Sequence, residues 1–399
     1  IRDRMGDIDQ FFQDSHYNIT RLLLSISGLW PFHSRNRRYA IYFAMVIILG
    51  SGLIFQILGI TEIWHDPFEL LDTVPSLFFA VVIISKTFCT IHALPQIKML
   101  LIKMHEYCLS PKSDEEEKIQ NSHALYGRKL GYVYTGFLLS HTILYLFAPL
   151  LTKLSYVESN KTNELANEEL NSQIELPYRV NYMIDLDTYY VPIFIHCSVC
   201  DLIYTVLLSV FDVLYLIVIE YSCGLFIALR SRLETALVSK LTITKDKCYS
   251  NIVYSIRRHT ETIQFVAIVE SVYSLALSIQ TGLTVFIISF LGYQVIKNVQ
   301  DVNRLVNLFA YLNAVLFTVF FVNWQGQKII DSSEKVFESA YNSEWYNMPI
   351  AARKLLIMIM MRSEKPSGLR IGKIVVLSYI TFNTVLRMSS SYFMLLRSL

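Results

Sequence analysis

The sequence predicts an all-α, polytopic membrane protein with seven transmembrane helices. Hydrophobic residues make up 53% of its 399 residues and charged residues only 17%, a balance on the membrane side of the averages for globular domains. Seven apolar segments are long enough to cross a hydrocarbon core of about 30 Å, which takes about 20 helical residues. These predicted spans are residues 39–60, 71–94, 130–151, 194–229, 262–291, 305–323 and 374–396.

The distribution of basic residues predicts how the chain is oriented. The segment before the first span and the second, fourth and sixth loops each carry six or more lysines and arginines. The odd-numbered loops hold few, among them Lys153, Lys161, Arg179 and Lys297. Because basic loops stay on the cytoplasmic side during insertion, we expect an inside amino terminus and an outside carboxyl terminus.

Four regions follow from this topology. Residues 1–38 form a cytoplasmic amino-terminal segment, with an interfacial helix expected to end near Trp30-Pro31. Residues 39–324 hold the first six spans and an outer ligand cavity, residues 325–370 a cytoplasmic helical stalk, and residues 371–399 the last span. The fourth and fifth spans exceed the bilayer thickness and should project into the cytoplasm. Helical periodicity over 334–361, broken at Pro349, predicts the stalk and a place where subunits meet.

The third loop, residues 152–192, is the longest exterior segment. Its second half is rich in aromatic residues, which are costly to expose, so it either folds over the bundle as a lid or forms a disordered loop. Two glycosylation sequons begin at Asn18 and Asn160. The predicted topology leaves Asn18 bare and makes Asn160 the glycan acceptor.

Motifs for catalysis and cofactors are missing from the sequence. It contains no HExxH, GxSxG, GxxxxGK[ST] or GxGxxG, so neither an enzyme nor a cofactor is expected. A net charge of +2 gives no indication of nucleic-acid binding. Cys197 and Cys200 have CxxC spacing, but no second pair of ligands accompanies them, which favours two buried thiols one turn apart over a metal or redox site.

Charged residues inside the spans are costly in lipid unless they are paired or face water. Lys86 is expected to pair with Asp212 or Glu220. A proton or ion relay in a transporter is the alternative, but it calls for inverted repeats and broken helices that the sequence does not show.

The last span carries a polar stripe on one face. At about 100° per residue, several small hydroxyl side chains and three apolar ones point to the same side of this helix. They are Leu377, Thr381, Thr384, Met388, Ser391 and Leu395. A water-filled pathway with a hydrophobic gate needs such a face. Serine and threonine also join helices in bilayers, so both interpretations stay open.

The outer halves of the second, third, fourth and sixth spans are rich in aromatic residues. An apolar cavity of this kind suits a small volatile organic ligand bound by shape and dispersion, although ordinary bundle packing is the alternative for each ring. The candidate ligand-binding residues are Phe78, Phe79, His141, Leu144, Tyr145, Asp201, Tyr204, Phe309 and Leu312.

The carboxyl-terminal third resembles the insect odorant receptors. The resemblance rests on an ordered run of motifs: residues 340–346 (AYNSEWY), residues 362–366 (RSEKP), Gly372-Lys373 and residues 390–397 (SSYFMLLR). It implies a tetrameric, odorant-gated, non-selective cation channel in the plasma membrane of olfactory sensory neurons. In such a channel the last span lines the pore, with Leu395 at the gate and Ser398 at the pore mouth. The stalk is the anchor region that holds the subunits together, and it contains Tyr341, Trp345 and Tyr346.

The short fourth loop, residues 230–261, refines this expectation. The family's shared co-receptor carries a long insert there, so the chain looks like a tuning subunit that forms a heterotetramer with the co-receptor. The rivals are a G-protein-coupled receptor, which normally has an outside amino terminus, a gustatory-type channel that works without this co-receptor, and a transporter.

Overall fold

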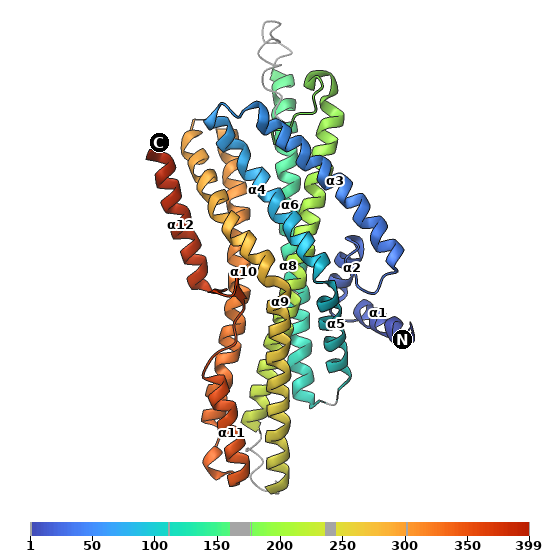
Figure 1. Ribbon diagram of the computed structural model, residues 1–399, viewed down its shortest axis with the longest axis vertical. Coiled ribbons are helices and arrows are strands. Elements are labelled where there is room, and N and C mark those ends of the chain that lie inside the picture. Colours follow the sequence, from blue (N-terminus) through green and yellow to red (C-terminus); the bar gives the residue numbers. More distant parts are fainter. Residues whose placement is uncertain are drawn as a thin grey trace.

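The computed structural model describes residues 2–110, 112–159, 176, 178–235, 245–300 and 302–398. The described chain is almost entirely helical, and it forms an elongated bundle (Figure 1). This confirms the predicted all-α class. The helices are α1 (Arg2–Asp14), α2 (Asn18–Ile26), α3 (Arg35–Glu62), α4 (Pro67–His92), α5 (Leu94–Leu109), α6 (Asp114–Ser159), α8 (Leu186–Thr235), α9 (Lys245–Lys297), α10 (Val302–Asn342), α11 (Ile350–Ser363) and α12 (Tyr379–Ser398).

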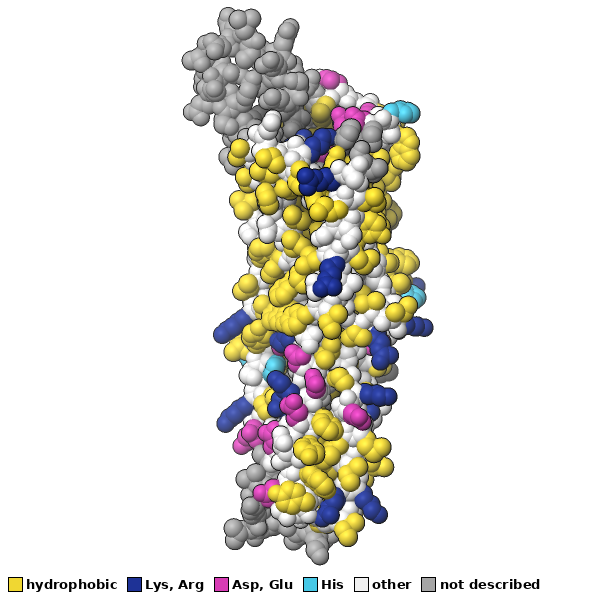
Figure 2. Space-filling view, turned by 90° about the vertical axis from the view of Figure 1, so that its left-hand side faces the viewer, with side chains coloured by type: hydrophobic (Ala, Val, Ile, Leu, Met, Phe, Trp, Pro, Cys, Tyr) yellow, Lys and Arg dark blue, Asp and Glu magenta, His cyan; other side chains and the backbone are white. Residues whose placement is uncertain are grey.

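Six of the described helices, α3, α4, α6, α8, α9 and α10, are long and apolar enough to cross a membrane. The last helix, α12, has 20 residues but is interrupted by Asn383, Arg387 and a run of serines, so it is less apolar than the others. Figure 2 shows hydrophobic side chains over most of the upper half of one face, whereas charged side chains gather mainly in the lower half. The outer surface therefore changes from lipid-compatible to water-compatible along the bundle.

Helix α8 is the centre of the bundle and packs against α3, α4, α6, α9 and α10. Every residue from 207 to 226 is buried. A helix that is hydrophobic on all sides is stable only when other helices surround it, and α8 is accordingly surrounded over this stretch.

Two charged groups of α8 are neutralised within the core. Asp212 accepts from the Lys86 ammonium at 2.8 Å and from the Tyr134 hydroxyl at 2.5 Å, and both members of the ion pair are almost completely buried. Glu220 instead contacts His123 at 3.1 Å and pairs with Lys328. Of the two partners expected for Lys86, the structure selects Asp212.

The lower part of the bundle is a helical stalk. Helix α9 has 53 residues, which corresponds to about 80 Å at 1.5 Å per residue and so far exceeds the membrane core. Helix α11 packs back against α9 and α10. The predicted break lies at Pro349, which caps α11 after the short 3-10 helix η3 (Trp345–Asn347).

A two-stranded hairpin leads from the stalk to α12. Strands β1 (Arg370–Ile371) and β2 (Val375–Val376) pair antiparallel, and Gly372 and Lys373 both have positive φ in the turn between them. The Ile374 N–H donates to the Ile371 carbonyl, as in a type I′ turn. Helix α10 then passes so close to this segment that a Cβ at Gly326 would lie 2.5 Å from the Leu377 Cβ.

The amino-terminal segment forms two helices instead of the single one expected from the sequence. Asp9 of α1 accepts from the Arg21 guanidinium at 2.7 Å and from the Trp30 indole N–H at 2.8 Å. Phe12 and Trp30 are fully buried, and α2 contacts α6 and α8. This segment is thus docked on the helical core through its apolar side chains.

Candidate ligand cavity

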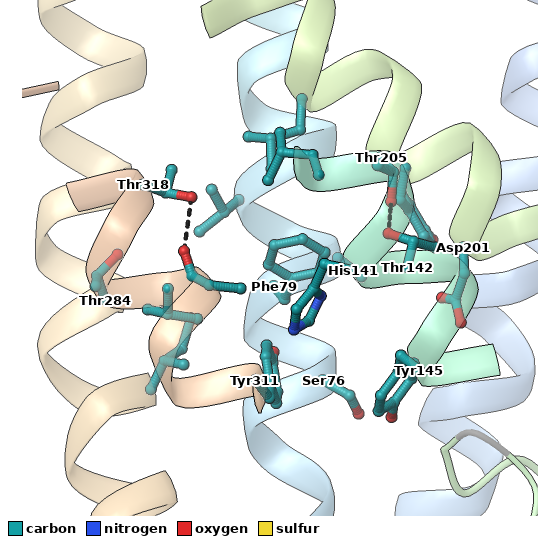
Figure 3. A pocket seen from close by; sticks show the side chains of 18 of the residues that line it. Ser76, Phe79, His141, Thr142, Tyr145, Asp201, Thr205, Thr284, Tyr311 and Thr318 are labelled. Atoms are coloured by element: carbon teal, nitrogen blue, oxygen red, sulfur yellow. Dashed lines mark hydrogen bonds between the residues drawn. The ribbon is translucent and has the colours of Figure 1, made fainter. Parts of the chain in front are cut away.

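A cavity of about 110 Å³ lies within the bundle, in the half away from the stalk. Helices α3, α4, α6, α8, α9 and α10 all contribute to its wall, and Tyr178 closes part of it from the loop before α8. This volume is of the same order as the roughly 150 Å³ cavity that holds benzene but somewhat smaller, so the space is on the scale of a very small organic molecule. Figure 3 shows Phe79, His141, Asp201 and Tyr311 around the cavity.

Five phenylalanine and tyrosine rings line the wall among aliphatic and hydroxyl side chains, and hydrogen bonds to the backbone fix three of these rings. The Tyr204 hydroxyl donates to the Leu49 carbonyl at 3.3 Å, the Tyr311 hydroxyl to the Pro75 carbonyl at 3.1 Å, and the Tyr178 hydroxyl to the Cys197 carbonyl at 3.4 Å. Since these hydroxyls are satisfied by the protein, the rings offer mainly apolar faces to a ligand.

Polar side chains also reach the cavity. Thr142 and Thr205 satisfy each other through a hydroxyl–hydroxyl hydrogen bond of 2.7 Å (Figure 3). Four other shielded atoms have no hydrogen-bond partner among the described residues: Asp201 Oδ2, His141 Nε2, Gln56 Oε1 and Gln280 Oε1. All four residues line the same cavity, so the aromatic enclosure contains an unusually polar interior.

Five of the nine residues expected to bind ligand line the cavity, namely Phe79, His141, Tyr145, Asp201 and Tyr204. The other four lie outside its lining. Phe78 packs against Phe286 and Phe290, with centroid separations of 6.4 and 6.2 Å. Leu312 packs in a cluster around Ile287 and Leu291, whereas Leu144 and Phe309 are exposed on the outside of the bundle, at 71% and 46%.

The sequence interpretation omitted residues from two further helices. Gln56 of α3 and Gln280 and Thr284 of α9 face the cavity. Their signal is visible in the sequence, because a glutamine inside an apolar span is costly unless it faces a partner or a cavity. Tyr311 was missed because Phe309, two positions earlier, is equally aromatic, and periodicity alone does not tell which side faces inward.

The segment from Tyr178 to Asp185 folds over the connected ends of α3 and α4. Arg179 pairs with Glu69 at 2.6 Å, the Asn181 N–H donates to the Phe55 carbonyl at 3.0 Å, and the Tyr182 ring stacks on Phe55 at 3.9 Å. These contacts agree with the lid alternative for this part of the loop. Asn160 and the rest of the acidic stretch, up to residue 175, lie outside the described residues.

An outer chamber of about 610 Å³ lies beside the cavity and beneath this segment. Ser76, Tyr145, Tyr178 and Tyr311 line both spaces, so they form the boundary between them. Three carboxylates, of Glu62, Glu69 and Asp72, face two guanidiniums, of Arg179 and Arg304, in the chamber wall. The outer chamber is therefore polar and carries an excess of negative charge.

Helix α12 lies at the edge of the bundle against α9 and α10 (Figure 1). Most of its polar stripe is not covered by the chain itself. Thr381 is buried and donates to the Val376 carbonyl at 2.6 Å. The exposed members of the predicted pore set are Thr384, Met388, Ser391, Leu395 and Ser398.

The structure also shows the surroundings of the cysteine pair and of the predicted subunit anchor. Cys197 and Cys200 are buried free thiols one turn apart on α8. No group of three potential metal ligands converges among the described residues. In the stalk, Tyr341 and Tyr346 are 60% and 61% exposed, and Trp345 packs partly against the core.

Comparisons with known proteins agree with this architecture. Residues 66–390 match the family model described as 7tm Odorant receptor. Odorant receptor 67c of Drosophila melanogaster is 29% identical over 190 residues, which cover 47% of this chain and 45% of that protein. Odorant receptor Or2 of Anopheles gambiae is 27% identical over 94 residues, or 24% of this chain and 25% of that protein. The matched stretches thus span less than half the length of either relative.

Two solved structures have the same fold. The insect olfactory receptor OR5 from Machilis hrabei in complex with eugenol superposes with a TM-score of 0.74 and 13% identity, covering 100% of this chain and 98% of that chain. The structure of OR5 without that ligand gives a TM-score of 0.72, again at 13% identity, over 95% of this chain and 96% of that chain.

Proposed function

Since the chain belongs to the 7tm odorant receptor family, we propose that it is a tuning subunit of an odorant-gated, non-selective cation channel. A small volatile ligand binds in the enclosed cavity, and the pore is formed together with the family's co-receptor. The observation that carries this proposal is the cavity itself, which six membrane-compatible helices and Tyr178 build around a space of small-molecule size.

Ligand binding in such a cavity acts by selecting a conformation. The odorant stabilises the state in which the wall closes around it, and the open pore follows if that state is coupled to α12. The exposed stripe of α12 supports a shared pore, because Thr384, Met388, Ser391 and Leu395 have no covering helix within the described chain. Leu395 is assigned to the hydrophobic gate and Ser398 to the pore mouth.

The stalk supports assembly with other subunits. Large apolar side chains that stay exposed on a water-facing surface commonly mark protein interfaces. Tyr341, Tyr346, Ile350, Met358 and Met361 are all more than half exposed. We assign this surface and Trp345 to the contacts of a heterotetramer in the plasma membrane of olfactory sensory neurons, with the amino terminus inside.

Patch-clamp recording from cells that express the chain with the co-receptor tests the cavity. Ala314 lines the cavity, so Ala314→Phe fills the space with a ring. We expect it to raise the half-maximal concentration of active odorants by at least about tenfold, which corresponds to about 1.4 kcal/mol. Leu144→Ala is the matched control, because Leu144 faces outward on α6.

Surface labelling of both variants separates loss of binding from loss of folding, and the milder Ala314→Val serves if Ala314→Phe is retained inside the cell. Unchanged responses of a surface-expressed Ala314→Phe channel to every odorant would refute the cavity as the ligand site.

A further inference from the structure

The cavity contains a carboxylate without a counter-charge. Asp201 projects from α8 into the space, and its Oδ2 is shielded and has no hydrogen-bond partner. Within the described residues, no lysine or arginine lines this cavity. Two basic groups of the bundle are engaged elsewhere, Lys86 with Asp212 and Arg179 with Glu69. An ionised carboxylate in such surroundings is costly unless a ligand brings a cation to pair with it.

Two further unpartnered atoms of the wall are acceptors, whereas the unpartnered His141 ring nitrogen can donate or accept. The amide oxygens of Gln56 and Gln280 lack donors, although both side chains are buried, at 2% and 5% exposure. An ammonium group has three N–H donors and no acceptor, whereas a hydroxyl offers one donor. The three unpartnered oxygens of Asp201, Gln56 and Gln280 therefore outnumber the single donor that an alcohol brings.

The aromatic wall favours a positive charge too. Phe79, Tyr145, Tyr204 and Tyr311 surround the same space, and the face of an aromatic ring attracts a cation within about 6 Å. The route from outside is also suited to a cation, because the outer chamber holds three carboxylates against two guanidiniums.

From these observations we propose that the cavity recognises a small organic amine, bound as its ammonium ion with the Asp201 carboxylate as counter-charge. This inference rests on the proposed function, because it assigns a ligand class to the cavity identified above. It differs from the sequence expectation of a cavity that binds by dispersion with few hydrogen bonds. Ordered water that satisfies Asp201 and the two glutamines is the competing explanation, and it predicts no preference for amines.

Three linear probes of seven non-hydrogen atoms each test the proposal on the channel assembled with the co-receptor: hexylamine, 1-hexanol and heptane. Wild type should respond to hexylamine at a concentration at least about tenfold below that of 1-hexanol, since a buried charge pair contributes more than a neutral hydrogen bond. Asp201→Asn should raise the half-maximal concentration of hexylamine about ten- to hundredfold and change that of 1-hexanol by less than about threefold. Asp201→Glu keeps the charge and should retain the preference for the amine.

The controls distinguish this inference from the proposed function. Leu144→Ala should alter neither response. If Ala314→Phe abolishes both responses while Asp201→Asn shifts hexylamine and 1-hexanol equally, the amine assignment is overturned and the ligand cavity stands. If Ala314→Phe alters no response, the cavity is not the ligand site and both proposals fall. The wild-type comparison needs no variant, so a stronger response to 1-hexanol or heptane than to hexylamine overturns the assignment even if Asp201→Asn does not fold.

Discussion

The buried ion pair between Lys86 and Asp212 yields the sharpest stability prediction. Both side chains are almost fully buried, 2.8 Å apart, and Asp212 also accepts from Tyr134 at 2.5 Å. Removing one member of a buried pair leaves the other charge uncompensated and typically costs about 3–5 kcal/mol. We therefore expect Lys86→Met and Asp212→Asn each to destabilise the bundle by this amount. Tyr134→Phe, which removes one hydrogen bond to a charged acceptor, should cost about 1.5–3 kcal/mol.

The double variant Lys86→Met/Asp212→Asn is decisive, because it removes both charges together. Its loss should be much smaller than the sum of the two single losses, since no unpaired ion remains. The assay is the midpoint temperature at which detergent-solubilised protein loses its monodisperse peak in size-exclusion chromatography. Lys335→Met, which removes an exposed lysine of the stalk, is the control and should leave the midpoint unchanged. Additive losses in the double variant, or single variants as stable as wild type, would refute the reasoning.

Three further predictions concern the path to the last helix, the gate and the topology. Gly326→Ala should destabilise the chain by about 1–3 kcal/mol, because its Cβ would overlap Leu377, whereas Gly282→Ala on α9 has open space and should be neutral or stabilising in the same melting assay. Leu395→Ala should increase the resting leak of the assembled channel or alter its ion selectivity; a variant identical to wild type in leak, selectivity and activation argues against the gate. Asn160→Gln should abolish a glycosidase-sensitive shift in electrophoretic mobility, and a wild-type chain without that shift contradicts an outside third loop.

The positions of the membrane helices were predictable because length and hydrophobicity determine them. The first predicted span, residues 39–60, lies within α3 (Arg35–Glu62). The ends of the longer helices were not predictable in this way. Helix α6 begins at Asp114, well before the predicted residue 130, since its first turns are charged and their helicity depends on capping and packing instead of on hydrophobicity. Helix α5 was not predicted from the sequence, because this segment lies in the second loop, which was described only by its basic residues.

The cavity was predicted only in part for a different physical reason. In a membrane bundle the lipid-facing and inward-facing sides of a helix are both apolar, so hydrophobic periodicity does not define its rotation. Leu144 and Tyr145 are neighbours on α6, yet only Tyr145 faces the cavity. Polar residues within the spans are the more informative signal, as Asp201, Gln56 and Gln280 show, because the cost of exposing them to lipid requires them to face inward.

One layer of side chains separates the cavity from the last helix. Val319 of α10 lines the cavity and also packs in a cluster with Val285 of α9 and Val385 of α12. One turn further along α9, the Ser289 hydroxyl donates to the Ser389 carbonyl of α12 at 3.0 Å. Because packed interiors resist compression, a ligand that shifts Val319 must displace Val385 or open a void beside it. Val319 is therefore the side chain through which the cavity wall contacts α12, and α9, which lines the cavity with Gln280 and Thr284, also packs against the last helix.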